Sequence, residues 1–224
     1  MKKKWKIFWI VCAVLAGAGA ISCIAGIAMG ADFSTFTHHF YHSGSEEVYN
    51  GIQSYEYEGG ITTLEIDASA IEVNVYSTQD QNIKVDFYKQ HHGTSHIESV
   101  QEGSTLKIDT NWERRWYGHK PEKSKIDIYI PATVELEKAE FDISAGKVYV
   151  KDVAVKNIEL DADACEFIFE GMDVEEYNYD IDMSIGTLKI AEQEFTGINV
   201  EKYINNNASK SVIIDGDASD IYFR

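Results

Sequence analysis

Cysteine, proline and positive charge are scarce in this chain of 224 residues. Of the three cysteines, Cys12 and Cys23 lie in an apolar run, so the rest of the chain holds a single thiol and cannot close a disulfide within itself. We interpret that thiol, Cys165, as a small buried residue. Only two prolines are present, and Pro131 follows an alternating segment, where a missing backbone donor is tolerated at a strand end.

The deficit of positive charge excludes one class of partner. The chain has 20 lysine and arginine residues against 37 aspartate and glutamate residues. Four of the basic residues precede residue 7 and every acidic residue follows residue 31, so the remainder carries 16 basic and 37 acidic side chains, a formal charge of -21. Because nucleic-acid affinity depends on basic side chains that neutralise phosphates, nucleic acid is excluded as a partner. The apolar content of 44% indicates a folded core.

Residues 7–30 form an uncharged apolar stretch. These 24 residues are long enough to cross a hydrocarbon core of about 30 Å as a helix. Lysines precede the stretch and Asp32 follows it, which places the N-terminus in the cytoplasm and the C-terminal part outside the cell. We therefore predict a cytoplasmic basic tip over residues 1–6, a transmembrane helix over residues 7–30 and a juxtamembrane linker over residues 31–60.

Two other interpretations of this apolar stretch stay open. A signal peptide cleaved near Gly30 would make the protein secreted, and a lipid anchor at Cys23 would make it a lipoprotein. If the stretch is a membrane helix, Gly26 and Gly30 form a G-x-x-x-G pair, which permits close approach of a second helix and predicts homo-oligomers within the membrane.

A repeat dominates the C-terminal half of the chain. Three lines that begin at Ala139, Ile158 and Tyr179 each contain an alternating strand, an aspartate, a turn of small residues and a second alternating strand. The aligned aspartates, 142, 161 and 182, are 19 and 21 residues apart. A period near twenty predicts a β-solenoid, similar to a parallel β-helix, with two strands per rung over residues 61–224. An antiparallel β-sandwich is the alternative all-β fold.

The repeat also predicts how its rungs pack. If rung follows rung, apolar side chains stack into two columns, one of Phe141, Leu160 and Ile181 and one of Val148, Phe167 and Leu188. Gly146 and Gly186 lie between the paired strands, where a tight corner needs a conformation that glycine adopts readily. The last residues, 221–224, still alternate as a strand, so we expect an open C-terminal edge that pairs with a second chain.

The order of these motifs resembles a known family. An Ile-x-Ile-Pro segment ends at Pro131, the decapeptide Phe-Asp-Ile-Ser-Ala-Gly-Lys-Val-Tyr-Val begins at Phe141, and one apolar span precedes both. This order is similar to the bacterial putative-adhesin domains of unknown function, which are membrane-anchored β-solenoid proteins of the cell envelope. The resemblance covers about residues 61 to 224. It implies a fold and a location on the cell surface, and it implies no catalytic residues.

Two clusters are candidate binding sites. Asp215, Asp217 and Asp220 offer oxygen ligands of the kind that calcium prefers, although aspartates at corners more often bind the backbone of their own turn. A locally basic and aromatic segment interrupts the strands and offers anchors for a surface glycan or an envelope protein, unless its tryptophans fold back over the end of the core. Its candidate residues are Trp112, Arg114, Arg115, Trp116 and Tyr117.

Enzymatic machinery is not evident in the chain. We find no nucleophile beside a base, no paired carboxylates on a groove, no phosphate-binding glycine loop and no metal triad, and no cofactor is expected. We therefore expect a non-enzymatic, membrane-anchored envelope protein that acts in adhesion or surface recognition. The alternative is an accessory or sensor of an envelope-stress system, and a polysaccharide-active β-helix enzyme is disfavoured because the turns are too short to wall a substrate cleft.

Overall fold

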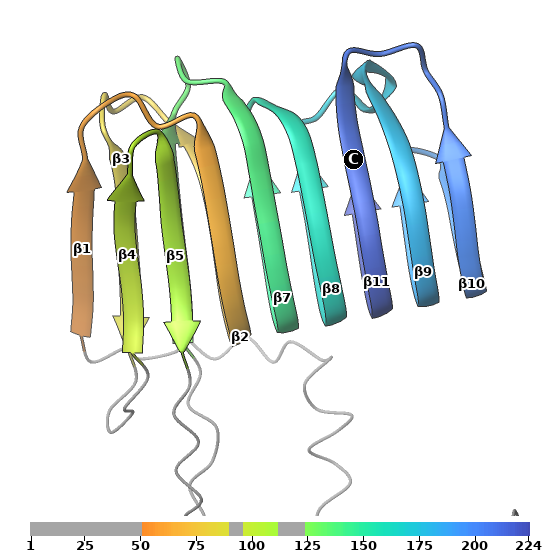
Figure 1. Ribbon diagram of the computed structural model, residues 1–224, viewed down its shortest axis with the longest axis horizontal. Helices are drawn as coiled ribbons and strands as arrows, with labels where there is room; N and C mark the ends of the chain where they lie inside the picture. The colour runs from red at the N-terminus through yellow and green to blue at the C-terminus, as the bar shows by residue number, and fades with distance from the viewer. Residues whose placement is uncertain (1–50, 90–95, 112–123) are drawn as a thin grey trace, which may run out of the picture. The chain divides into compact units, whose positions relative to one another are not determined.

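The computed structural model describes residues 51–89, 96–111 and 124–224 (Figure 1). The chain divides into two compact units, Met1–Glu47 and Val48–Arg224, and every described residue belongs to the second. Within the described residues, none of the helices has the length and apolar character that a bilayer span requires. The predicted span over residues 7–30, with Gly26 and Gly30, lies outside them.

The described unit is almost entirely β-structure, which confirms the all-β prediction. One short 3-10 helix, η1 (Val174–Glu176), precedes β9. The strands are β1 (Gly51–Tyr57), β2 (Thr63–Thr78), β3 (Ile83–Lys89), β4 (His96–Glu102), β5 (Thr105–Asn111), β6 (Ser124–Pro131), β7 (Leu136–Lys151), β8 (Val155–Glu170), β9 (Tyr177–Ile190), β10 (Gln193–Ile204) and β11 (Lys210–Phe223).

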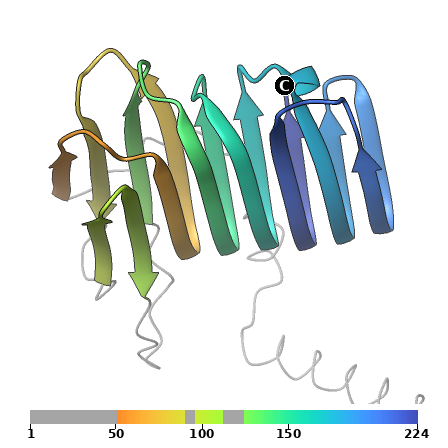
Figure 2. The same cartoon turned by 45° about the horizontal axis from the view of Figure 1, so that its top comes forward.

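Five long strands give the unit its shape. β2, β7, β8, β11 and β9 lie side by side and parallel, and each bends near its middle so that its two halves belong to two facing layers (Figures 1 and 2). Shorter strands extend the layers at one end: β5 pairs with the first half of β2, and β6 pairs with its second half. β3, β1 and β4 add antiparallel pairs at that end, and β10 pairs antiparallel with β9 at the other.

The bend depends on residues that the repeat singled out. Gly146 and Gly186 have φ angles of 144° and 146°, a region that L side chains rarely adopt. A Cβ at Gly146 would collide with the carbonyl oxygen of Ile71, and one at Gly186 would collide with that of Ser219. Glycine is therefore required at both corners, as predicted. In β8 the matching position is Cys165, which is buried and whose Sγ–H donates to the carbonyl of Ile143 at 2.9 Å.

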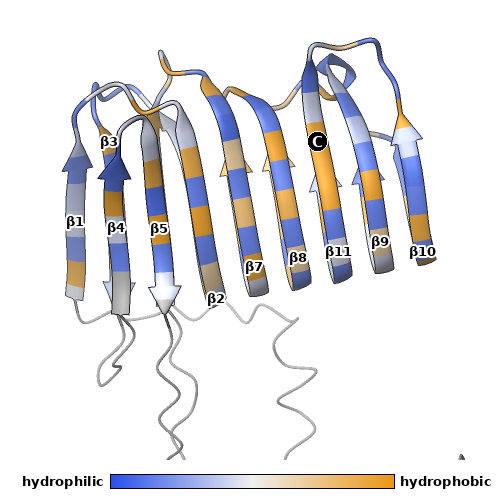
Figure 3. Ribbon diagram, viewed as in Figure 1, coloured by the Kyte–Doolittle hydropathy of each residue, from blue (hydrophilic) through white to orange (hydrophobic). Residues whose placement is uncertain are grey.

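The core lies between the two layers. Apolar and polar residues alternate along each long strand, visible as the banding in Figure 3, and the apolar set faces inward. Phe141 contacts Phe167 and Phe169 edge-on, with ring centres 6.2 and 6.1 Å apart, and Phe169 stacks on Phe223 at 4.8 Å. The chain therefore closes its core only by stacking neighbouring strands, as the solenoid prediction requires.

The order of the last strands corrects the prediction. β11 lies between β8 and β9, so rung does not follow rung after β8. Leu160 is opposite Ile214, and Ile214 in turn is opposite Ile181, so Leu160 and Ile181 are separated by one strand. The predicted columns of inward apolar residues exist, but β11 adds a residue to each column between the residue from β8 and the residue from β9.

Two further predictions were wrong. The C-terminal strand is not an open edge, because β11 is hydrogen-bonded to β8 on one side and to β9 on the other. Residues 51–57, assigned to the juxtamembrane linker, instead form β1, which pairs with β3 over its whole length. The amphipathic alternation of β1 is weak, since most of its side chains are exposed, and that is why the sequence pattern missed it.

Candidate functional site: a tyrosine face

The outer surface of one layer carries a concentration of tyrosines. Outward positions on β3, β6, the second half of β2, and the second halves of β7 and β11 come into register through the ladder. They hold five half-buried tyrosines, which we call the tyrosine face: Tyr76, Tyr88, Tyr129, Tyr149 and Tyr222. Isoleucine 168 continues the face between Tyr149 and Tyr222.

Three of these rings form a contiguous strip. Tyr76 is directly opposite Tyr129 in the ladder, and their ring centres are 5.8 Å apart. On the other side, the ring centre of Tyr149 lies 6.0 Å from that of Tyr76 in an edge-to-face arrangement. Aromatic pairs at such distances stabilise one another and present a wide, rigid surface with polar tips.

Lysines and carboxylates frame the strip. The ammonium of Lys84 lies 5.7 Å from the ring centre of Tyr129, and that of Lys125 lies 5.0 Å from that of Tyr88. Lys151 pairs with Glu170 at 3.0 Å, and Glu170 also accepts a hydrogen bond of 2.7 Å from the hydroxyl of Tyr149. The face is thus aromatic in the middle and charged, with both signs, at its margins.

A buried polar network supports the tyrosines at the β3–β6–β2 end. Asp86 and Asp127 lie opposite each other across β3 and β6, and they are only 5% and 4% exposed. Lys84 binds Asp86 at 2.8 Å and Lys125 binds Asp127 at 3.0 Å. Asn74, 4% exposed, donates to Asp127 at 2.9 Å. Ser54 donates to Asp86 at 2.6 Å. Because each buried carboxylate has a cation and a further donor, the network holds its strands in one register.

The same surroundings keep the phenols protonated. Burial, followed by the charge of Asp127, raises the pKa of Tyr76 to about 12. Burial also raises the pKa of Tyr129 and that of Tyr88. The hydrogen bond to Glu170 is the main cause of the raised pKa of Tyr149. At physiological pH these hydroxyls therefore act as neutral hydrogen-bond donors and acceptors.

The outer surface of the other layer is acidic instead. Neighbouring strands place one carboxylate each at the same height, which we call the acidic row: Asp109, Asp67, Asp142, Asp161, Asp215, Asp182 and Glu201. All seven are exposed. The aligned aspartates 142, 161 and 182 thus belong to a longer row, which also includes strands outside the three aligned lines.

The three predicted calcium ligands do not converge on one point. Asp215 belongs to the acidic row, Asp217 accepts a hydrogen bond of 2.9 Å from Ser184, and Asp220 accepts one of 3.0 Å from the backbone of Thr187. In the part of the chain that the structure describes, no three His, Cys, Asp or Glu residues are grouped so as to hold a metal ion. Asp217 and Asp220 instead bond to the neighbouring strand β9, whereas the alternative expected bonds to the backbone of their own turn.

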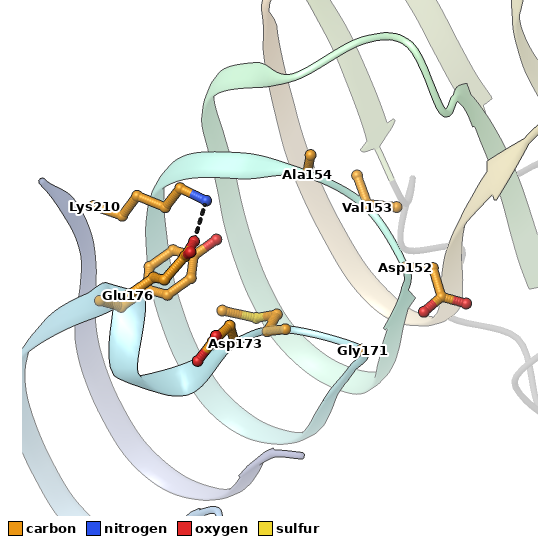
Figure 4. A pocket seen from close by; sticks show the side chains of 9 residues that line it. Asp152, Val153, Ala154, Gly171, Asp173, Glu176 and Lys210 are labelled. Atoms are coloured by element: carbon orange, nitrogen blue, oxygen red, sulfur yellow. Dashed lines mark hydrogen bonds and ion pairs between the residues drawn. The ribbon is translucent and has the colours of Figure 1, made fainter. Parts of the chain in front are cut away.

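A surface pocket of about 260 Å³ lies at the ends of β7 and β8 (Figure 4). Asp152, Gly171, Glu176 and Lys210 contribute to its lining, with Lys210 bound to Glu176 at 2.8 Å. The same ammonium lies 5.4 Å from the ring centre of Tyr177. Since its one lysine is already paired, the pocket offers a ligand little unsatisfied charge, and we assign it no function.

The predicted aromatic segment, with Trp112, Arg114, Arg115, Trp116 and Tyr117, lies outside the described residues. Its flanks are described: it joins the end of β5 at Asn111 to the start of β6 at Ser124. β6 then carries Lys125, Asp127 and Tyr129 of the tyrosine face and its network. In the chain, the predicted binding segment thus leads directly into β6, one of the strands of that face.

Sequence reasoning missed the tyrosine face itself. Its five tyrosines come from five strands spread over residues 76–222, and no short motif joins them. One signal was available: in Ile128-Tyr-Ile130 and Val148-Tyr-Val150, a tyrosine occupies the outward position between two buried aliphatic residues. Large aromatic residues are more frequent in binding surfaces than on the rest of a protein surface, so their presence at outward positions of several neighbouring strands indicates a binding surface.

The arrangement defines a class: an all-β, solenoid-like stack of bent strands, with tyrosines gathered on the outer side of one layer. The chain belongs to the family described as Toastrack DUF4097, whose model matches residues 61–206. That family assignment confirms the resemblance found from the motifs.

Solved structures of similar shape come from several bacteria. A putative cell adhesion protein from Clostridium sporogenes is 13% identical, with 77% of this chain and 97% of that chain covered and a TM-score of 0.45. A putative adhesin from Parabacteroides distasonis is 11% identical, covering 77% and 73% of the two chains, with a TM-score of 0.34. One from Bacteroides fragilis is 9% identical, covering 78% and 98%, with a TM-score of 0.27. No curated protein matches the chain.

Proposed function

We propose that this protein is a non-enzymatic recognition module of the bacterial cell envelope, and that it binds a surface glycan through the tyrosine face. One observation carries the proposal: Tyr76, Tyr129 and Tyr149 form a continuous strip whose hydroxyls stay protonated. The apolar segment over residues 7–30 is proposed to anchor the module, with the described unit outside the cell.

The chemistry of the strip suits a carbohydrate. A sugar ring offers a face of C–H groups and a rim of hydroxyls, so it needs an aromatic surface with donors and acceptors around it. Tyrosine supplies both, because its ring is apolar and its hydroxyl bonds in either direction. Tyrosine also loses little conformational entropy when it makes a contact, which favours its use in recognition surfaces.

The strip runs across three neighbouring strands, β6, β2 and β7, which suits an extended polymer better than a small molecule. Small ligands usually bind in concave pockets that bury most of their surface. The described pocket at Lys210 is lined by residues of other segments and includes none of the five tyrosines. A polysaccharide chain lying across several strands would instead contact successive rings.

The test compares binding of the full-length protein, purified in detergent, to insoluble cell-wall polysaccharide by co-sedimentation. The double variant Tyr76→Ala and Tyr129→Ala should reduce binding at least tenfold, since stacked aromatics dominate such interfaces. Tyr203→Ala is the matched control, because Tyr203 is 65% exposed on β10 and away from the strip. Binding unchanged by the double variant, with folding intact by circular dichroism, would reject the tyrosine face as the site.

A second pair of variants separates the two candidate sites. Replacing Trp112 and Trp116 with alanine tests the predicted aromatic segment in the same assay. Loss of binding in the tryptophan variant but not in the tyrosine variant would place the site in the aromatic segment. Loss with both pairs would indicate one continuous site across the segment and β6. Binding to envelope proteins but not to polysaccharide would change the ligand class to protein.

A further inference from the structure

The stack of bent strands ends at β10. Among the described strands, β10 pairs only with β9, so its second edge is open at this end of the unit (Figure 1). Phe195, Val200 and Ile204 pack against the core and are only partly buried. Each lies opposite a fully buried residue of β9. The end of the core therefore presents apolar side chains that a further strand would cover.

Lys202 breaks this apolar pattern. It lies directly opposite Ile181, which is 2% exposed, so its side chain leaves the strand on the core side. Lys202 is nevertheless exposed, because none of the described strands lies beyond β10. Its ammonium lies 3.9 Å from the ring centre of Phe195, a distance at which the ring attracts the cation.

The contact between Lys202 and Phe195 joins the two layers. β10 follows β9 around its corner, with Gly197 opposite Gly186. Phe195 precedes that corner and Lys202 follows it, so the two side chains start from different layers. The lysine stem thus crosses the end of the core, and we call this contact between Lys202 and Phe195 the lysine strap. Lysine suits the position, since its stem covers apolar surface while its ammonium stays in water.

A further strand beside β10 would cover the lysine strap. If the inner face of that strand is apolar, the ammonium of Lys202 leaves water and gains no opposite charge. An unpaired buried charge strongly opposes association. Inward-pointing charged side chains are one of the ways in which natural sheets keep their edges free.

Other forms of edge protection are weak in β10. The strand is 12 residues long, contains no proline, and has Lys202 as its only basic residue. Ile198 is 76% exposed and Tyr203 is 65% exposed, so β10 also presents large apolar side chains to solvent. The two glutamates of β10 lie on its outer side, where they would stay in water beside a further strand. The inward charge of Lys202 is therefore the feature of β10 that opposes pairing.

We propose that the lysine strap is an autoinhibitory contact, which keeps β10 closed to strand addition and so prevents association of the protein through this edge. Replacing the charge with an apolar side chain would join Phe195, Val200 and Ile204 into one continuous apolar set. β10 would then accept a strand from a second copy. The proposal concerns the end of the stack alone and is independent of the glycan proposed for the tyrosine face.

The experiment is sedimentation equilibrium of the full-length protein in detergent over a range of concentrations. Lys202→Met keeps an unbranched stem beside Phe195 and removes the charge, so it should lower the dissociation constant for self-association at least about tenfold. Lys202→Arg keeps the charge and should stay within about threefold of the wild type. Lys189→Met is the matched control, because Lys189 lies outward on β9, and it should also stay within about threefold. Association through the predicted membrane segment is the same in every variant and cancels in the comparison.

A rescue and a second readout locate the effect. Val200→Lys added to Lys202→Met restores a charge at the next inward position of β10 and should return the dissociation constant to within about threefold of the wild type. Hydrogen exchange followed by mass spectrometry should show protection of residues 193–204 that grows with concentration in the Lys202→Met variant and not in the wild type. Lys202→Met that associates no more than the wild type, or no more than Lys189→Met, overturns the proposal. Association without added protection of β10, or without rescue by Val200→Lys, overturns it as well.

Discussion

Asp142 on β7 lies directly opposite Asp161 on β8, in the middle of the exposed acidic row. Burial and then the neighbouring carboxylates raise the pKa of both side chains, with Asp67 acting on Asp142, and Asp142 and Asp215 acting on Asp161. Like charges directly opposite in a sheet oppose folding. The acidic row therefore lowers the stability of the folded unit, and burial of the apolar core must offset this effect.

The first prediction is that Asp161→Asn stabilises the protein. The amide keeps the shape of the side chain and removes a charge that faces a carboxylate on each side. We expect the free energy of unfolding at pH 7 to rise by roughly 0.5–1 kcal/mol. Urea denaturation followed by circular dichroism measures it. Glu192→Gln, at an exposed turn position between β9 and β10 and outside the row, is the control and should change stability by less than about 0.5 kcal/mol.

The second prediction concerns pH. A carboxyl group whose pKa is raised in the folded protein binds its proton more tightly there than in the unfolded chain. Its protonation therefore favours folding, and that contribution is present below the unfolded pKa and lost as pH rises through the folded pKa. The stability gain of Asp161→Asn should accordingly be largest at pH 7 and shrink as pH falls toward 4. A gain that stays constant from pH 7 to pH 4 would contradict this cause.

The third prediction tests the corners with a matched pair of glycines. Gly186→Ala adds a Cβ that collides with the carbonyl oxygen of Ser219, at a φ of 146° that disfavours alanine, and should cost about 3–5 kcal/mol. Gly197→Ala faces open space and should cost about 1 kcal/mol. Thermal unfolding of the two variants compares them. Equal losses would mean that crowding between strands does not determine the corner.

The repeat predicted these corners because a tight corner restricts the backbone conformation and the size of the residue at that position. Gly146 and Gly186 stand at fixed places between alternating segments, and the alternation assigned the inward residues of β7, β8 and β9. The order of β9 and β11 was not predictable in this way. Ile181 and Ile214 are both buried aliphatic residues at equivalent positions of their strands, so by its pattern either strand fits beside β8 equally well.

Side-chain contacts outside the repeat accompany that order. The amide of Asn178 donates to the carbonyl of Ala208 at 2.8 Å and accepts from the backbone N–H of Asn206 at 2.9 Å. These bonds join the connection between β10 and β11 to the start of β9. A single asparagine with such partners leaves no signature in the alternation of the chain. The tyrosine face escaped notice for a similar reason, since only the folded ladder brings Tyr76 and Tyr129 together.

The fourth prediction concerns the network beneath the tyrosine face. Asp127→Ala leaves Lys125 and the buried amide of Asn74 without their shared partner and should destabilise the protein by about 2–3 kcal/mol. Glu137→Ala is the control, because its ion pair with Lys156, at 2.6 Å, lies in solvent and should contribute less than about 1 kcal/mol. Urea denaturation distinguishes the two. A loss no larger than the control's would show that the network does not stabilise β6 against β2.

The last prediction concerns Cys165, which replaces glycine at the corner of β8. The thiol is 5% exposed, its hydrogen bond to Ile143 occupies its proton, and burial raises its pKa to about 11. Since the thiolate is the reactive form, the folded protein should resist thiol reagents at pH 7–8. In a variant with serine at positions 12 and 23, an aromatic disulfide reagent should label Cys165 only as fast as the unit unfolds, and urea should accelerate labelling in step with the loss of ellipticity. Rapid labelling of the native protein would mean that the corner at Cys165 opens locally without unfolding of the unit.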